Sequence, residues 1–238
     1  MSYLIKPNLI LLPGLLNDAR LWQHQADFLA PIANISVADL TRHDSIAALA
    51  SDVLEQAPAG MFALAGMSMG GYVALEIMRQ APERVMALAL LDTSARPDTE
   101  EATENRRKLM ALAQTDFPAV PRGLREKLLH PVHLGDAELA ERIDDMATVV
   151  GKEGFIRQQQ AILSRVDSRP TLSTIPCSTL VLCGREDRLT PVEVHEEMAA
   201  LIPHASLTIV EHCGHLSPIE QPQQVSDALH GWLQNRRM

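Results

Sequence analysis

The sequence predicts an α/β fold in which a doubly wound, mostly parallel sheet carries an inserted helical cap. Three observations support this class. Short, continuous apolar runs recur along the chain, segments with helical periodicity separate most of them, and one long stretch after the fourth run lacks any strand pattern. Such runs are typical of strands buried on both faces, as in a parallel sheet covered by helices. Strands and helices that alternate over short connections indicate double winding.

The strands and core helices follow from these patterns in order. The expected strands are Leu9–Leu12, Ile35–Leu40, Met61–Ala65, Val85–Leu91, Leu180–Cys183 and Leu207–Val210. The expected helices are Asp18–Leu29, Ser45–Ala57, Met69–Gln80, Pro191–Leu201 and Gln223–Arg236. Asn17 and Thr190 precede the first and fourth of these helices, and we expect them to act as N-caps because short polar side chains accept hydrogen bonds from unpaired N–H groups.

The stretch without strands contains charged residues, yet each of its helical segments keeps an apolar stripe that would pack against a core. The expected helices are Glu100–Gln114, Val120–Leu129, Ala137–Val150 and Phe155–Val166. We therefore expect residues 1–94 and 171–238 to form the core, and residues 95–170 to form a helical cap.

Composition narrows the function. The chain has 238 residues, of which 46% are hydrophobic and 21% are charged, as in ordinary globular domains. No apolar run approaches the roughly 18 residues that span a bilayer. A net charge of −9 and an aromatic content of 3% argue against nucleic acid, which selects basic surfaces and stacking platforms. We expect a small-molecule substrate, no nucleic-acid or membrane partner, and a monomer or homodimer.

The cysteines and the N-terminal residues bear on location. Cys177, Cys183 and Cys213 are odd in number and lack a repeating spacing, which argues against a disulfide framework. The first residues show no basic region, apolar stretch or cleavage site of a signal peptide. The sequence therefore predicts a cytoplasmic location.

The strongest chemical signal is Gly66-Met67-Ser68-Met69-Gly70, which follows an expected strand and opens an expected helix. A Gly-x-Ser-x-Gly turn in this context holds a serine at the edge of the sheet as a nucleophile, and the two glycines leave room for the neighbouring strand and helix. The glycines match neither a P-loop nor a dinucleotide-binding pattern. We therefore predict Ser68 as a nucleophile and expect no cofactor.

A serine nucleophile needs a base, and His215 follows the last expected strand, at the same edge of the sheet. His212 is the alternative, and Gly214 permits the turn that would direct His215 inward. The pair His130 and His133 lacks a third ligand, and the group His212, Cys213 and His215 lacks a fourth. We therefore expect no metal.

An acid that orients the base should follow another strand. Asp187 occupies such a place after Leu180–Cys183, with Glu186 beside it but expected to point the other way. Asp92, after Val85–Leu91, is the competing carboxylate. We select Asp187 and leave Asp92 as the alternative.

A tetrahedral intermediate needs two backbone donors for its oxyanion. The N–H of Met69, directly after the nucleophile, is one candidate. The other is the N–H of Leu15, with Leu16 second, because both follow the first strand and Gly14 allows close approach of the backbone.

The order of four motifs along the chain resembles that of the α/β-hydrolase fold superfamily, and most closely that of its compact bacterial carboxylesterases and enol-lactone hydrolases. The motifs are Pro13-Gly14-Leu15, Gly66-Met67-Ser68-Met69-Gly70, Gly184-Arg185-Glu186-Asp187 and Gly214-His215-Leu216-Ser217-Pro218. The resemblance covers almost the whole chain and is weakest over residues 95–170. It implies Ser68 as nucleophile, Asp187 as acid, His215 as base, and Met69 and Leu15 as oxyanion donors.

The sequence departs from this family in two ways. Pro13-Gly14 replaces the His-Gly of many members, which alters the surroundings of the oxyanion hole. Only eight residues precede Leu9, so we expect the antiparallel strands at the start of the family's sheet to be shortened or missing.

The resemblance implies a serine hydrolase that cleaves a small, largely apolar carboxylic ester through an acyl-enzyme. Cleavage of a C–C bond, a lactone or a thioester by the same residues stays open, as does a non-catalytic receptor on this fold.

Overall fold

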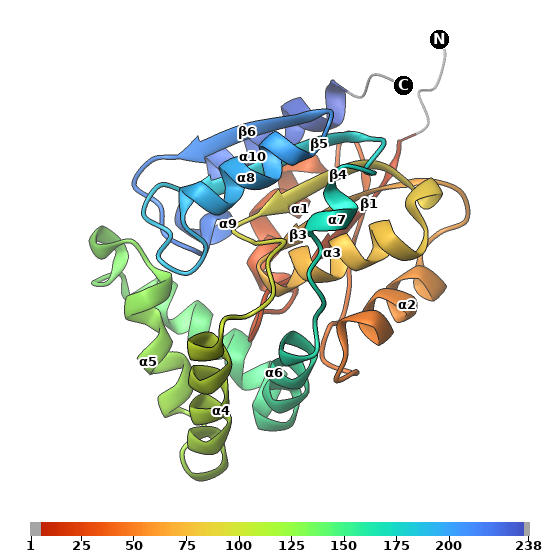
Figure 1. Cartoon of the computed structure of the whole chain (residues 1–238). Coiled ribbons are helices and arrows are strands. Elements are labelled where there is room, and N and C mark those ends of the chain that lie inside the picture. Colours follow the sequence, from red (N-terminus) through yellow and green to blue (C-terminus); the bar gives the residue numbers. More distant parts are fainter. Residues whose placement is uncertain (1–5, 236–238) are drawn as a thin grey trace.

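The computed structural model describes residues 6–235 and contains one sheet covered by helices (Figure 1). The strand order is β2-β1-β3-β4-β5-β6, and all five pairings in the described chain are parallel. The predicted fold class is confirmed. The strands are β1 (Asn8–Leu12), β2 (Asn34–Val37), β3 (Phe62–Met67), β4 (Val85–Leu91), β5 (Ser178–Gly184) and β6 (Ala205–Val210).

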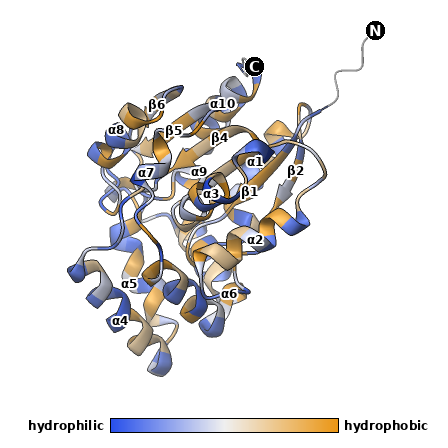
Figure 2. Ribbon diagram, turned by 45° about the vertical axis from the view of Figure 1, so that its right-hand side comes forward, coloured by the Kyte–Doolittle hydropathy of each residue, from blue (hydrophilic) through white to orange (hydrophobic). Residues whose placement is uncertain are grey.

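Helices cover both faces of the sheet. Helices α1 (Gln23–Leu29) and α10 (Pro222–Gln234) pack on one face, and α2 (Ile46–Gln56), α3 (Met69–Gln80) and α8 (Val192–Leu201) pack on the other (Figure 1). Successive residues of β1 enter opposite cores: Leu9 and Leu11 lie in the first, and Ile10 and Leu12 in the second. Because both of their faces are buried, the central strands β1, β3, β4 and β5 are largely apolar (Figure 2). The edge strand β2 instead alternates exposed polar residues with half-buried apolar ones.

The connection between β4 and β5 is helical. It contains α4 (Glu100–Thr115), α5 (Ala119–Leu128), α6 (Ala137–Leu163) and the short α7 (Arg169–Leu172). Helices α4, α5 and α6 gather at one end of the molecule, away from the sheet (Figure 1). We call α4 to α7 the helical insertion. A third apolar cluster holds it together and includes Leu16 from the loop after β1, so the insertion also packs on the core.

Several boundaries differ from the sequence prediction. The two expected helices after Ala137 are joined as α6, with a kink where Gly151 has a φ of 69°. The first helix is preceded by a 3-10 turn, η1 (Ala19–Trp22), and Asp18 rather than Asn17 caps it. Thr190 does not cap α8, which begins at Val192 after Pro191. The expected helix end at Arg236 and the N-terminal residues 1–5 lie outside the described residues.

Short elements without a sequence signal also appear. They are η2 (Pro82–Arg84), η3 (Pro131–His133), α7 and α9 (Ser217–Glu220). Each has only three or four residues, which is too short for a periodicity to be read.

The turn from β3 into α3 is packed so closely that it requires glycine. A Cβ at Gly66 would overlap the carbonyl oxygen of Gly70, and a Cβ at Gly70 would overlap the carbonyl oxygen of Leu12 in β1. The second overlap is with backbone of a neighbouring strand, so it cannot be relieved by rotating a side chain. The two glycines therefore fix how closely α3 approaches the sheet.

Two further findings concern the whole described chain. No helix within residues 6–235 has both the length and the apolar character needed to cross a membrane. Cys177, Cys183 and Cys213 are all unpaired.

We predict that Gly70→Ala lowers the free energy of unfolding by about 3 kcal/mol, because the new methyl group must displace backbone in a fully packed region. Gly231→Ala is the matched control. Gly231 lies in α10 with no atom within 4 Å of an added Cβ. That change should raise the free energy of unfolding by up to about 1 kcal/mol through helix propensity. Urea unfolding of both variants measures the difference, and equal midpoints would contradict the packing argument.

Candidate active site

The structure brings Ser68, His215 and Asp187 together at the carboxyl edge of the sheet, after β3, β6 and β5 respectively. The distance from Ser68 Oγ to His215 Nε2 is 2.9 Å, and the distance from His215 Nδ1 to Asp187 Oδ2 is 2.7 Å. The carboxyl ends of parallel strands meet at one edge, which is why residues so far apart in sequence converge.

Ser68 has an unusual backbone conformation, with a φ of 52° and a ψ of −116°. Residues other than glycine rarely adopt positive φ, and the cost of such strain is about 1–3 kcal/mol. The surrounding structure enforces it: the Ser68 N–H donates to the carbonyl of Leu91 at 2.9 Å, and the Thr93 hydroxyl donates to the Ser68 carbonyl at 2.8 Å. The strained turn presents the Ser68 side chain to His215.

Asp187 is held by four polar contacts. Its carboxylate accepts hydrogen bonds from the N–H groups of Leu189 at 2.8 Å and Thr190 at 3.0 Å, and from the Thr190 hydroxyl at 2.6 Å, besides its contact with His215. Burial favours the neutral acid, but the charge of His215 and these hydrogen bonds outweigh it and lower the pKa of Asp187. The carboxylate is therefore ionised although its side chain is buried.

His215 is also buried, with 3% of its surface exposed. Burial alone would lower the pKa of its imidazole, but the negative charge and hydrogen bond of Asp187 dominate and the pKa of His215 is raised. Its backbone N–H donates to the carbonyl of Leu128, at the end of α5, at 2.7 Å. The loop that carries His215 is thus tied to the helical insertion.

The competing carboxylate, Asp92, occupies a different place. It accepts hydrogen bonds from the Gly184 N–H at 3.0 Å and from the N–H and hydroxyl of Ser217. Complete burial, reinforced by the charge of Asp187, raises the pKa of Asp92. Asp92 therefore ties the ends of β4 and β5 to the loop after β6, whereas Asp187 makes the hydrogen bond with His215.

Glu186, His212 and Cys213 lie in the same two loops as Asp187 and His215 but have different surroundings. Glu186 accepts the N–H of Cys213 at 3.0 Å, and His212 is exposed. Cys213 is buried, its thiol donates to the carbonyl of Gly214, and burial above all raises the pKa of that thiol. A thiol whose pKa is raised in this way is a poor nucleophile.

The backbone donors predicted for an oxyanion are available. Among the described residues, the N–H groups of Leu15 and Met69 meet no hydrogen-bond acceptor. The N–H of Leu16, the second candidate, donates to Oε1 of Gln158 at 3.0 Å and is therefore already paired. Leu15 lies in the loop after β1, and Met69 follows Ser68 in the first turn of α3.

A cavity of about 410 Å³ opens onto Ser68 and His215. Its floor is the edge of the sheet with the loop of Leu15 and Leu16, and its walls come from α4, α5 and α6. Apolar side chains such as Leu109, Leu124 and Ile162 form most of the lining. The helical insertion thus encloses the space next to Ser68.

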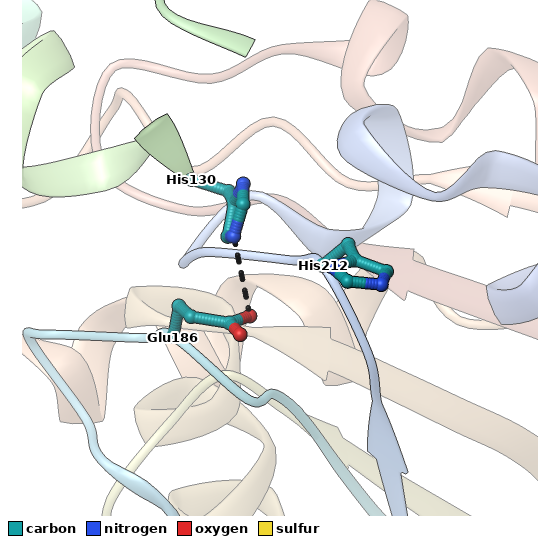
Figure 3. A group of neighbouring side chains, drawn as sticks. All are labelled: His130, Glu186 and His212. Carbon is teal, nitrogen blue, oxygen red and sulfur yellow. Dashed lines mark ion pairs between the residues drawn. The ribbon is translucent and has the colours of Figure 1, made fainter. Parts of the chain in front are cut away.

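Figure 3 shows a second group of side chains, His130, Glu186 and His212, whose potential ligand atoms lie within 4.8 Å of one another. His130 Nε2 is 3.8 Å from a carboxylate oxygen of Glu186. His130 Nδ1 accepts the Val132 N–H at 3.1 Å, so in the neutral ring the proton is on Nε2, the nitrogen that would have to bind a metal. We therefore interpret the group as a polar contact between the insertion and the loops after β5 and β6.

Three supporting residues carry no signal in the sequence. His195 is a fully buried histidine of α8 that accepts the Thr93 N–H at 3.0 Å and contacts the carbonyl of Pro191 at 3.2 Å. Gln158 in α6 is fully buried and bonds to the loop of Leu16. Thr93 holds the Ser68 carbonyl. Each acts through a contact between residues far apart in sequence, which a local pattern does not reveal.

Comparisons with known proteins identify a family model and solved structures that this chain is similar to. Residues 9–228 match the model of the alpha/beta hydrolase family. A thermophilic esterase from Thermogutta terrifontis, solved with malate bound, superposes with a TM-score of 0.89 and 29% identity, covering 98% of this chain and 91% of that one. The enol-lactonase from Burkholderia xenovorans has a TM-score of 0.88 and 22% identity, covering 99% and 94%, and shows the shared fold alone.

Curated relatives match over shorter stretches. The pimeloyl-[acyl-carrier protein] methyl ester esterase of Xanthomonas axonopodis pv. citri is 28% identical over 117 residues, which are 47% of this chain and 46% of that protein. The chain spans less than half the length of the curated relatives it matches.

We predict that the imidazole of His215 titrates above the ordinary histidine pKa of about 6.5 and that Asp187→Asn lowers its pKa, because the carboxylate charge stabilises the imidazolium. His195 is the internal control: burial lowers its pKa to about 4, and it should stay neutral down to that pH in both proteins. NMR titration of ¹⁵N-labelled histidines measures both rings. An unchanged His215 pKa in the Asp187→Asn variant would contradict the interpretation that the Asp187 carboxylate raises the pKa of His215.

Proposed function

The chain belongs to the alpha/beta hydrolase family, and from that premise we propose that it is a serine hydrolase that cleaves a small carboxylic ester through an acyl-enzyme on Ser68. The observation that carries the proposal is the continuous hydrogen-bonded series from Ser68 Oγ through His215 to Asp187, at the floor of a cavity. The esterase from T. terrifontis, similar over 98% of this chain, supports an ester as the substrate.

In the first step, His215 removes the proton of Ser68 and the serine oxygen attacks the ester carbonyl. This requires His215 Nε2 to be unprotonated and Nδ1 to carry the proton. The ionised Asp187 accepts that Nδ1–H and so fixes the tautomer. The same charge stabilises the imidazolium that forms when Nε2 takes up the serine proton.

The tetrahedral intermediate places negative charge on the former carbonyl oxygen. The unpaired N–H groups of Leu15 and Met69 are the donors for this oxyanion. Met69 begins α3, so the positive end of the helix dipole adds to their effect. The alcohol leaves with the proton from His215, and water attacks the acyl-enzyme by the same route to release the acid.

In this proposal, residues 95–170 act as a cap over a core formed by residues 1–94 and 171–238. The cap supplies apolar walls for the aliphatic part of a substrate, and closure over Ser68 limits the access of water. The mechanism needs neither a cofactor nor a metal.

We predict that Ser68→Ala lowers kcat for activated esters by a factor of at least about 10³, because the nucleophile is lost while the oxyanion donors stay. A fluorophosphonate probe should add one adduct per wild-type chain, on Ser68, and none to the variant. Intact mass and peptide mapping measure the adduct. An unlabelled wild-type protein would favour a non-catalytic receptor over an enzyme.

Two carboxylate variants separate the roles of Asp187 and Asp92. We predict that Asp187→Asn lowers kcat by about 10³- to 10⁴-fold, because the amide stabilises neither the tautomer nor the imidazolium. Asp92→Asn keeps an oxygen that can accept from Gly184 or Ser217, and we expect a loss below tenfold. Steady-state kinetics on one ester measures kcat for both variants. A larger loss of kcat in Asp92→Asn than in Asp187→Asn would assign the role of the acid to Asp92.

A panel of esters, lactones and thioesters matched in size tests the bond type. We expect esters to give the highest kcat/KM. A higher kcat/KM for lactones or thioesters would leave Ser68 as the proposed nucleophile and would replace the ester by that bond type in the proposed reaction.

A further inference from the structure

Building on the proposed function, we propose that the substrate ester carries a carboxylate remote from the scissile bond, and that Arg106 in the wall of the cavity binds it. The substrate class is then a half-ester of an aliphatic dicarboxylic acid, or an ester of equivalent charge. Three features of the described residues support this: the charge of the cavity lining, the free donors of Arg106 and an unpaired buried amide.

The charge of the cavity is opposite to that of the chain. The chain has a net charge of −9. The cavity lining, as far as the described residues form it, nevertheless contains four cationic side chains and a single carboxylate, that of Asp98; the cations are Arg96, Arg106, Lys127 and Arg165. A cleft lined by one sign of charge concentrates ligands of the opposite sign. Arg96 is paired with Glu197 at 2.7 Å, so the excess of positive charge comes from Arg106, Arg165 and Lys127.

Two of these cations share one counter-ion. Arg106 contacts Asp98 at 2.6 Å, and Arg165 contacts the same carboxylate at 2.8 Å. All three side chains are at least four-fifths buried. One carboxylate balances one guanidinium, so the cluster keeps a net positive charge in the cavity lining, and this charge attracts an anion.

Arg106 has donors left for a ligand. Its Nε and one terminal nitrogen face Asp98, and the other terminal nitrogen donates to Oε1 of Gln159 at 3.0 Å. A guanidinium has five N–H groups, so two remain. Arg165 is more fully committed, because it also bonds to the carbonyls of Arg96 and Ile162 and lies over the ring of Tyr72. Arg106 is therefore the residue that can bind a carboxylate.

Gln159 provides the third feature. It lies in the cavity wall, is fully buried, and its Nε2 has no hydrogen-bond partner among the described residues. The hydrogen bond from Arg106 to its oxygen fixes the amide orientation, so the unpaired atom is a donor. Leaving a buried donor unpaired is unfavourable, and an acceptor on a bound ligand would satisfy it. Arg106 and Gln159 thus offer donors only, which suits a carboxylate.

The test compares monomethyl adipate with methyl hexanoate, which have similar length and differ in the carboxylate. In wild-type protein at low ionic strength, we expect a higher kcat/KM for monomethyl adipate, and we expect added salt to reduce that preference. Arg106→Gln should lower kcat/KM for monomethyl adipate about tenfold or more, mainly through KM, and change methyl hexanoate by less than about threefold. Gln159→Leu should act in the same direction with a smaller effect.

Two matched variants serve as controls. Arg107→Gln removes a charge from an exposed neighbour in α4 and should leave both esters unchanged. Arg106→Lys keeps the charge and should retain the salt-sensitive preference in part. Normal hydrolysis of methyl hexanoate by Arg106→Gln verifies that the variant is folded. Equal kcat/KM for the two esters in wild-type protein, or equal losses for both in Arg106→Gln, would overturn the proposal.

Failure of the proposed function gives a different result. If wild-type protein hydrolyses neither ester, calorimetric binding of adipate to wild-type and Arg106→Gln protein decides the inference on its own. Binding that the variant loses supports the anion site without catalysis. Absence of binding by the wild-type protein overturns it.

Discussion

The arrangement of the site depends on one buried charge, the carboxylate of Asp187. A carboxylate removed from water is stable only when hydrogen bonds and an opposite charge replace its hydration. The turn after β5 supplies the N–H groups of Leu189 and Thr190, and the loop after β6 supplies His215. The same bonds that keep Asp187 ionised therefore set the position, the tautomer and the basicity of His215, and through it the environment of Ser68.

A second constraint acts on the opposite side of the site. The close approach of Gly70 to Leu12 fixes α3 against β1, and the strained residue Ser68 lies in the turn that leads from β3 into α3. Steric packing thus positions Ser68, whereas electrostatics positions His215 and Asp187. Together, the two sets of contacts bring Ser68 Oγ to 2.9 Å from His215 Nε2.

The sequence allowed the fold class and the residues of the edge to be predicted, because buried parallel strands are uniformly apolar and end at a common edge. The sequence did not decide between Asp187 and Asp92 as the partner of His215, because both follow strands. In the structure Asp187 forms a hydrogen bond with His215, whereas Asp92 accepts one from Ser217. Element ends were less accurate, because the kink at Gly151 and the capping by Asp18 depend on local backbone geometry. The roles of His195 and Gln158 were not predictable, because their partners lie about a hundred residues away or more.

The second half of α6 is anchored to the core, unlike α4. Arg157 donates to the carbonyl of Thr41 at 2.7 Å, and Gln158 bonds to Leu16 and Leu40. In α4, by contrast, Ala113 is the one buried residue. Displacing the end of α6 would break three hydrogen bonds and disturb the loop of Leu15, whereas displacing α4 would disturb far less of the core. The wall of the cavity that the second half of α6 forms is therefore attached to the core more firmly than the wall that α4 forms.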